Sequence, residues 1–433
     1  MLSKSLEPFF EMPSASGTAI YIACWFVVLA FLNIFYAHEY HSKVTKHITK
    51  KIENIFIQAL VLCFLNGIPK MILMVNLYRT FPIQVFASAI SGTTQISIAI
   101  SLALVLIFAK TNCFVHHISF YKDVLFLEAS HLLLLIMFSN TADTLTIPIM
   151  TLSVFFAFLF NTFSLPAYIS QVPAEAQDTV SSHPQAPHPS LGLYPIRFIF
   201  NTIFLDPDQL SSSSKKTSYT IMLSPAISLL VGMVHFRIDI GRLEFLLSLI
   251  CSFFAGLLLY MMIRKRIFST ISCLYTLAVS MLFFSIIMEN LVDLTVRISN
   301  ATGLGIQLLS GTFLSLQSNL TEIVTCLKYK GNEMLTVSSC SILYTHIFNA
   351  LLFFPTIRLL LTKDGILPHS QNISNAPFVY FSYVFILAEI KVIFVNYLLR
   401  HHKLTKDLGY TLIAIYALFI IGFAIEGKEH LCK

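Results

Sequence analysis

The stretch QSNLTEIVTCLKYKGNEMLTVSSCSILYTHIFN, residues 317–349, decides the fold because it places polar groups within an apolar run that could cross a bilayer. Its first part carries Ser318, Asn319, Glu322 and Thr325 within about two helical turns. A carboxylate at membrane depth is costly unless a cavity, a partner or a bound ion compensates it. We therefore predict a functional site around Glu322 inside a membrane-spanning helix.

The composition of the whole chain predicts an all-α, polytopic membrane protein. Of the 433 residues 56% are hydrophobic and 12% are charged, whereas about a quarter of the residues of soluble domains are charged. The net charge of +6 fits cytoplasmic loops rich in Lys and Arg, so we expect membrane lipid as a partner and no nucleic acid. The eight cysteines contain no Cys-x-x-Cys pair, which indicates small core residues rather than a disulfide framework.

Apolar runs of about twenty residues predict about twelve transmembrane helices. They lie near residues 18–37, 55–77, 82–109, 118–139, 144–165, 218–235, 244–263, 269–292, 303–327, 333–360, 376–398 and 408–425. Residues 166–217, between the fifth and sixth helices, are rich in Pro, Ser, Gln and His and predict a flexible hydrophilic linker.

The distribution of Lys and Arg among the predicted loops orients the bundle. Most of them fall on one side if both termini lie outside. The sequons at Asn300 and Asn372 then lie in outer loops, which makes both residues glycosylation candidates. Residues 1–17 lack the Arg-rich character of a mitochondrial presequence. We therefore expect the endoplasmic reticulum, the vacuole or the plasma membrane rather than the mitochondrial inner membrane.

Two pairs of polar segments recur at equal spacing in the two halves of the chain. FLNGIPK (64–70) is followed by GTTQIS (92–97) at the same distance at which LQSNLTE (316–322) is followed by YTHIFN (344–349). The copies lie in the second and the ninth predicted helices, which are seven apart in chain order, and because this number is odd the copies should have opposite orientations in the membrane. Inverted repeats of this kind are typical of alternating-access transporters.

The same segments resemble the alpha-repeats of cation/calcium exchangers, in the branch of the mitochondrial sodium/calcium exchanger and the plant and fungal cation/calcium exchangers. Asn66-Gly67-Ile68-Pro69-Lys70 looks like the Gly-Asn-Gly-Ala-Pro-Asp motif of their first repeat. The segments at 290–292, 317–322 and 347–349 fall at the spacing of motifs in their second repeat. Each motif is degenerate by itself, and their shared order carries the resemblance.

The resemblance implies a domain organisation and a function. Residues 1–165 would form a first exchanger membrane region with repeat 1 at about 55–109, and residues 269–433 a second region with repeat 2 at about 303–360. An extra helix pair at 218–268 would follow the linker. The implied function is a membrane cation antiporter, not an enzyme, with a site for Ca, Na or H at the bilayer midplane and no cofactor.

The resemblance also implies an ion-binding site made by both repeats. Its residues would be Glu322, Asn319, Ser318, Thr325, Asn66, Lys70, Thr94 and Asn349. Glu322 would bind the metal ion directly, because Ca²⁺ prefers hard oxygen ligands. Gly67 and Pro69 are expected to break their helix and free the backbone carbonyls near Leu65 and Asn66 for a cation.

Lys70 departs from the family pattern, because the exchangers have an acid at this position. The charges of Lys70 and Glu322 sum to about zero, and a divalent cation would be repelled by the ammonium. Two interpretations stay open. Lys70 is a tethered cation that loses its proton when an ion enters, as in a proton-coupled antiporter, or it forms a static salt bridge in a transport-inactive, exchanger-derived scaffold or regulator. An intramembrane enzyme is less favoured because the sequence shows no catalytic motif, and the oligomeric state is not predicted.

Overall fold

The computed structural model describes residues 15–52, 54–81, 83–109, 113–115, 117–139, 146–164, 200, 203–204, 215–236, 248–257, 261, 269–328, 332–356, 359 and 377–429. The elements in chain order are α2 (Ala15–Tyr36), η2 (Ala37–His41), α3 (Ser42–Thr49), α4 (Ile55–Thr80), α5 (Ile83–Ile96), η3 (Ser97–Leu102), α6 (Ala103–Phe108), β1 (Cys113–Phe114), α7 (His117–Ser139), α8 (Thr146–Ser164), α11 (Lys215–Phe236), α13 (Ser269–Thr302), α14 (Ile306–Leu309), η6 (Ser310–Leu314), α15 (Ser315–Lys328), α16 (Asn332–Phe348), η7 (Asn349–Phe353), α18 (Pro377–Leu399), β2 (Lys403–Leu404) and α19 (Lys406–Glu429), where η marks a π-helical segment.

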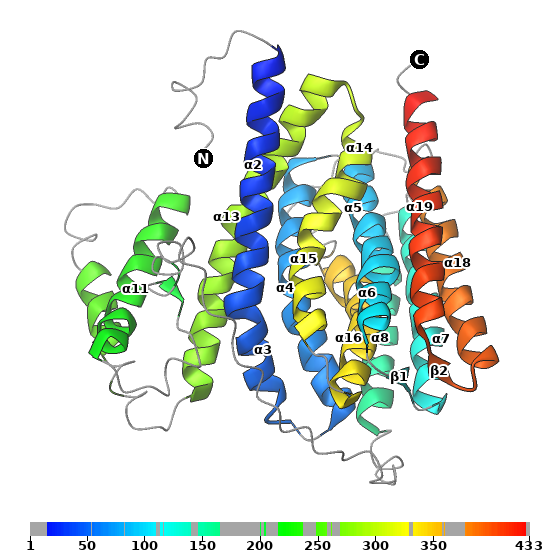
Figure 1. Cartoon of the computed structure of the whole chain (residues 1–433), viewed down its shortest axis with the longest axis horizontal. Helices are drawn as coiled ribbons and strands as arrows, with labels where there is room; N and C mark the ends of the chain where they lie inside the picture. Colours follow the sequence, from blue (N-terminus) through cyan, green and yellow to red (C-terminus); the bar gives the residue numbers. More distant parts are fainter. Residues whose placement is uncertain are drawn as a thin grey trace.

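Roughly parallel helices form the body of the molecule, with α4, α5, α15 and α16 at its centre and α18 and α19 at one side (Figure 1). The start of α4 illustrates how local sequence sets an element. The side chain of Asn54 accepts hydrogen bonds from the backbone nitrogens of Phe56 (2.9 Å) and Ile57 (3.3 Å), which satisfies two amides that have no partner inside the helix.

Five helices in the described part of the chain are long and apolar enough to span a membrane, so the chain is an integral membrane protein. They contain Ile55–Leu77, Gln84–Phe108, Tyr275–Thr302, Leu335–Thr356 and Tyr380–Leu399. Each of the twelve predicted spans overlaps a helix in the described residues. The number of crossings itself stays a prediction.

The predicted end of the eighth span, residue 292, is wrong. The helix α13 continues to Thr302, because the first residue able to stop it is Gly303, which takes the left-handed conformation with φ +72°. The sequon residue Asn300 is consequently exposed in the last turn of α13 and not in a loop. The second sequon, at Asn372, and most of the linker 166–217 lie outside the described residues.

The two halves of the chain interlock at the centre of the bundle. The helix α4 packs against α16, and α5 packs against η6 and α15. Ser315 Oγ donates to the backbone oxygen of Ala89 (3.0 Å), and Ser310 Oγ to that of Val85 (3.2 Å). Small and hydroxylated residues allow this close approach, as in other membrane helix pairs. The residues of the two predicted repeats therefore share one interface.

A short antiparallel pair of strands closes one end of the bundle. Cys113 pairs with Leu404 and Phe114 with Lys403, which ties the segment after α6 to the segment before α19. Burial raises the pKa of the Cys113 thiol. Five of the seven cysteines in the described residues are buried, which fits the prediction of small core residues.

Candidate functional site

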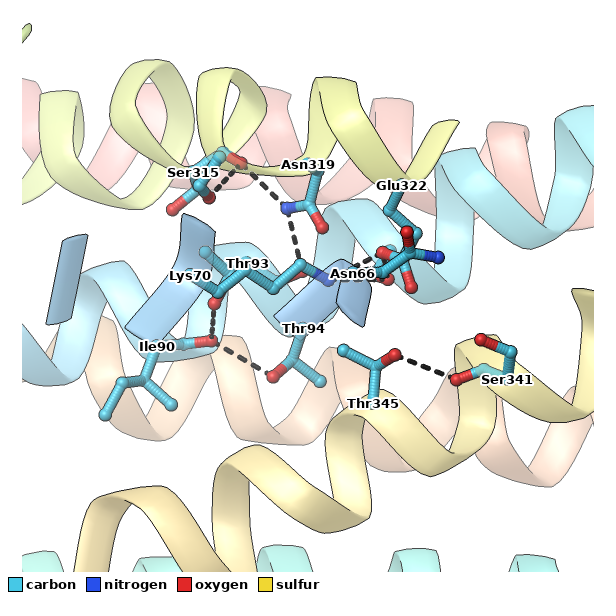
Figure 2. A network of polar contacts seen from close by, with 12 residues as sticks. Asn66, Lys70, Ile90, Thr93, Thr94, Ser315, Asn319, Glu322, Ser341 and Thr345 are labelled. Atoms are coloured by element: carbon cyan, nitrogen blue, oxygen red, sulfur yellow. Dashed lines mark hydrogen bonds and ion pairs between the residues drawn. The ribbon is translucent and has the colours of Figure 1, made fainter. Parts of the chain in front are cut away.

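An ion pair between the two halves lies at the centre of the site. Lys70 Nζ, on α4, is 2.6 Å from Glu322 Oε2, on α15. Both side chains are completely buried. Figure 2 shows the Lys70 side chain running between the residues of α15 and those of α5 toward the Glu322 carboxylate. The two charges that the sequence placed at equivalent motif positions are therefore in direct contact.

Ser97 completes the group on the same carboxylate oxygen. The Ser97 hydroxyl, at the start of η3, donates to Glu322 Oε2, and its oxygen also accepts from Lys70 Nζ at 3.3 Å. Sequence reasoning missed this residue. Ser97 is the last residue of the segment 92–97, and it aligns with Asn349, the last residue of the segment 344–349. This equivalence to a predicted site residue could have identified Ser97 from the sequence.

The carboxylate is satisfied on one side only. Glu322 Oε1 has no hydrogen-bond partner among the residues that the structure describes. Neither do Asn319 Oδ1 and Thr325 Oγ1, which lie on the same helix within one turn of Glu322. Buried polar atoms in proteins almost always have a partner. This face of α15 therefore presents three oxygens that can bind a cation or a water molecule.

The remaining polar groups of α15 hold the helix against its neighbours. Asn319 Nδ2 donates to the backbone oxygens of Ser315 (2.7 Å) and Thr93 (3.1 Å), and Ser318 Oγ donates to the backbone oxygen of Ser315 (3.0 Å). The amide of Asn319 thus bridges α15 to α5 (Figure 2). Because its nitrogen is held on this side, its oxygen points away from the bridge.

Residue Asn66 lies one turn before Lys70 on α4. Asn66 Oδ1 is 3.3 Å from His41 Nε2, and its amide nitrogen has no partner in the described residues. The expected helix break at Gly67 and Pro69 is wrong, because α4 runs without interruption from Ile55 to Thr80. Pro69 still removes one donor, so the Leu65 carbonyl lacks its usual bond within the helix.

Two further predicted residues lie on the second helix of each repeat. Thr94 Oγ1 donates to the backbone oxygen of Ile90 at 3.0 Å, so its hydroxyl is turned back to its own helix. Asn349 begins η7, and neither atom of its amide has a partner among the described residues. The sequence separation between Ser97 and Asn349 equals that between Lys70 and Glu322, which is 252 residues.

All eight predicted site residues are buried, at 0–2% exposure. They are Asn66, Lys70, Thr94, Ser318, Asn319, Glu322, Thr325 and Asn349. Among these eight residues, Lys70 and Glu322 are the only two that a hydrogen bond in the described part of the chain joins to each other. No group of three or more His, Cys, Asp or Glu residues that could hold a metal occurs in the described part of the chain. A cation at Glu322 would therefore complete its shell with amides, hydroxyls and backbone carbonyls.

The buried polar centre within apolar helices is an arrangement found in membrane proteins that handle ions. Along most of its length the chain is similar to solved structures of such proteins. The H⁺/Ca²⁺ exchanger CAX is 10% identical, with 99% of this chain and 91% of that chain covered and a TM-score of 0.48. For the Ca²⁺/H⁺ antiporter protein YfkE the identity is 12%, the coverage 93% and 92%, and the TM-score 0.48.

The sodium-calcium exchanger NCX_Mj is 12% identical to this chain, with 93% of this chain and 99% of that chain covered and a TM-score of 0.43. No protein-family model matches the chain, and no curated protein matches its sequence. At these identities and TM-scores, the likeness does not decide which ion the chain binds.

Proposed function

We propose that the chain is a membrane cation antiporter, in which Glu322 binds the transported cation between two inverted repeats that alternate access. One observation carries the proposal. The Glu322 carboxylate is completely buried and uses only Oε2 for Lys70 and Ser97, while Oε1 has no partner in the described residues. A carboxylate that is kept half-satisfied at membrane depth is suited to bind an exchangeable cation.

The charge balance of the site favours a monovalent cation exchanged for a proton. The Lys70 ammonium and the Glu322 carboxylate sum to zero. If a monovalent cation binds Glu322 while Lys70 releases one proton to the solvent, the site again sums to zero. A divalent cation bound in the same way would leave one positive charge in a buried site, which is strongly unfavourable. Lys70 is thus the resident cation that the transported ion replaces.

The pairing of elements supports an alternating mechanism. Each of α5 and α16 ends one residue before a π-helical segment, at Ser97 and Asn349. These two residues are separated in sequence by the same 252 residues as Lys70 and Glu322. Matched irregularities of this kind, facing a shared polar centre, are expected of two repeats that exchange roles as the site opens to either side.

The first prediction concerns flux through the purified protein. In proteoliposomes with an imposed cation gradient, we expect the native chain to move protons against sodium, with calcium-45 as the divalent comparison that should move far less, and Glu322→Gln to reduce the sodium-driven proton flux at least about tenfold. The amide keeps the shape of Glu322 but removes the charge that binds the cation. Proton flux is followed with a pH-sensitive dye inside the vesicles, and calcium flux by filtration.

A matched control is Glu128→Gln on α7. Glu128 is partly exposed and forms its ion pair with Lys391, so the same chemical change occurs away from the site. It should keep the flux of the native protein. Absence of every flux from native protein with native helical circular dichroism would contradict the antiporter proposal and favour the alternative function.

The alternative is a transport-inactive, exchanger-derived scaffold or regulator. The short contact between Lys70 and Glu322, 2.6 Å, is the observation that favours it, because a buried ion pair can be purely structural. Under this alternative, Lys70→Asp should create divalent cation flux where the native protein has none, since two acids would then face each other. Under the antiporter proposal, Lys70→Asp should instead abolish proton coupling of a flux that is already present.

A further inference from the structure

A second buried carboxylate, that of Glu389, lies away from the central ion pair. It is on α18, close to the middle of the apolar stretch Tyr380–Leu399, and is 0% exposed. Unlike Glu322, it has no ion pair with any described Lys, Arg or His. Its polar neighbour is Gln95 of α5, whose Nε2 donates to Glu389 Oε1 at 2.5 Å. Sequence reasoning did not single out this residue.

Two oxygens at this contact have no partner in the described residues. They are Glu389 Oε2 and Gln95 Oε1, and both belong to completely buried side chains. An ionised carboxylate here would have one neutral amide to compensate its charge. Burial of an unpaired charge costs far more than one such hydrogen bond returns, so the group neutralises instead.

The titratable groups on the helices around Glu389 do not provide a counter-charge. The helix α5 and the segment η3 contain no titratable side chain. From α19, Tyr416 lies within electrostatic range of Glu389. From α7, His131 contacts Tyr383 of α18. Glu128 of α7 and Lys391 of α18 neutralise each other, because they form an ion pair. Lys403 of β2 lies beyond the end of α18.

We propose that Glu389 is a proton-binding site, held by Gln95 and separate from the Lys70–Glu322 pair. The bound proton resides on Oε2 as a carboxylic acid, and Oε1 then acts as the acid carbonyl that accepts from Gln95 Nε2. Gln95 Oε1 is the acceptor that the acid O–H can use after a small rotation of either side chain. When the proton leaves to solvent, the bonding pair of its O–H bond stays on Oε2.

Because of the position of Gln95, binding or release of this proton can affect the contact between Ser97 and Glu322. Gln95 and Ser97 are two residues apart at the junction of α5 and η3, and Ser97 bonds to Glu322. Gain or loss of the proton at Glu389 therefore acts on the same stretch of helix that positions Ser97. This link rests on the proposed antiporter function, whereas the proton site itself does not.

Infrared difference spectroscopy of the full-length protein in lipid films tests the site without measuring transport. Spectra recorded at acidic, neutral and alkaline pH should contain the carbonyl-stretch band of a protonated carboxylic acid that is still present at neutral pH. Glu389→Gln should remove that band. Gln95→Leu, which leaves Glu389 intact, should shift it to higher frequency because the amide no longer donates to the acid carbonyl.

Three controls separate Glu389 from the other buried or paired acids of the described residues. Glu322→Gln, Glu128→Gln and Asp123→Asn should each keep the band, because these three carboxylates have cationic partners. A neutral-pH band that survives Glu389→Gln would overturn the proposal. So would a band that disappears when sodium or potassium chloride is added at constant pH, since the site would then bind an alkali cation. Loss of flux in Glu322→Gln with the Glu389 band unchanged would leave both proposals standing.

Discussion

Replacing Lys70 with methionine is expected to destabilise the folded protein by about 3–5 kcal/mol. The substitution leaves Glu322 as a buried carboxylate whose remaining donor is Ser97. Breaking a buried ion pair on one side costs much more than removing the whole pair. The double variant Lys70→Met/Glu322→Gln should therefore recover most of the loss, and the measurement is a double-mutant cycle of denaturant unfolding followed by circular dichroism.

The control for this cycle is Lys43→Met. Lys43 pairs with Glu39 at 3.9 Å near the surface, with a quarter of its side chain exposed, and such pairs contribute about 0–1 kcal/mol. A Lys70→Met protein as stable as the native chain would contradict the structure of the site. It would mean that Glu322 takes up a proton or an ion from solution without cost once the ammonium is gone.

The second large effect is expected at Gly92, where the two halves touch through their backbones. A Cβ atom on Gly92 would lie 1.8 Å from the backbone oxygen of Gly311. Neither backbone can move without separating α5 from η6, so Gly92→Ala should destabilise the protein by about 3 kcal/mol or more. The same unfolding measurement applies.

Gly232→Ala provides the matched comparison for that substitution. A Cβ at Gly232 would meet Leu282 Cδ2 at 3.6 Å, an ordinary contact, and the change should be within about 1 kcal/mol of the native stability. If Gly92→Ala were equally mild, the close approach of α5 and η6 would not exist in the folded protein.

Much of the fold and the centre of the site were predictable from the sequence. Long apolar runs specify membrane helices because the bilayer demands internally bonded backbone. The contact between Lys70 and Glu322 was predictable because each would otherwise be an isolated charge at membrane depth. Equal spacing in the two halves then singled out further polar residues, all of which are buried.

Other features depend on packing that a linear pattern does not contain. Pro69 was expected to end a helix, but its fixed φ is compatible with helical geometry, and the packing of α4 against α16 holds the helix together. The π-helical start at Ser97 has no sequence signal of its own. The sequence does not predict a site at Glu389, because its amide partner, Gln95, is distant in the sequence and carries no charge.

The sequence separation of Lys70 and Glu322, 252 residues, has a consequence for biosynthesis. At ribosomal rates of about 5–20 residues per second, Lys70 is made roughly 10–50 s before its counter-charge. During that interval the growing chain holds an ammonium in or near the membrane without its partner. We expect the early helices to remain loosely inserted, and to need the insertion machinery or a membrane chaperone beside them, until α15 emerges.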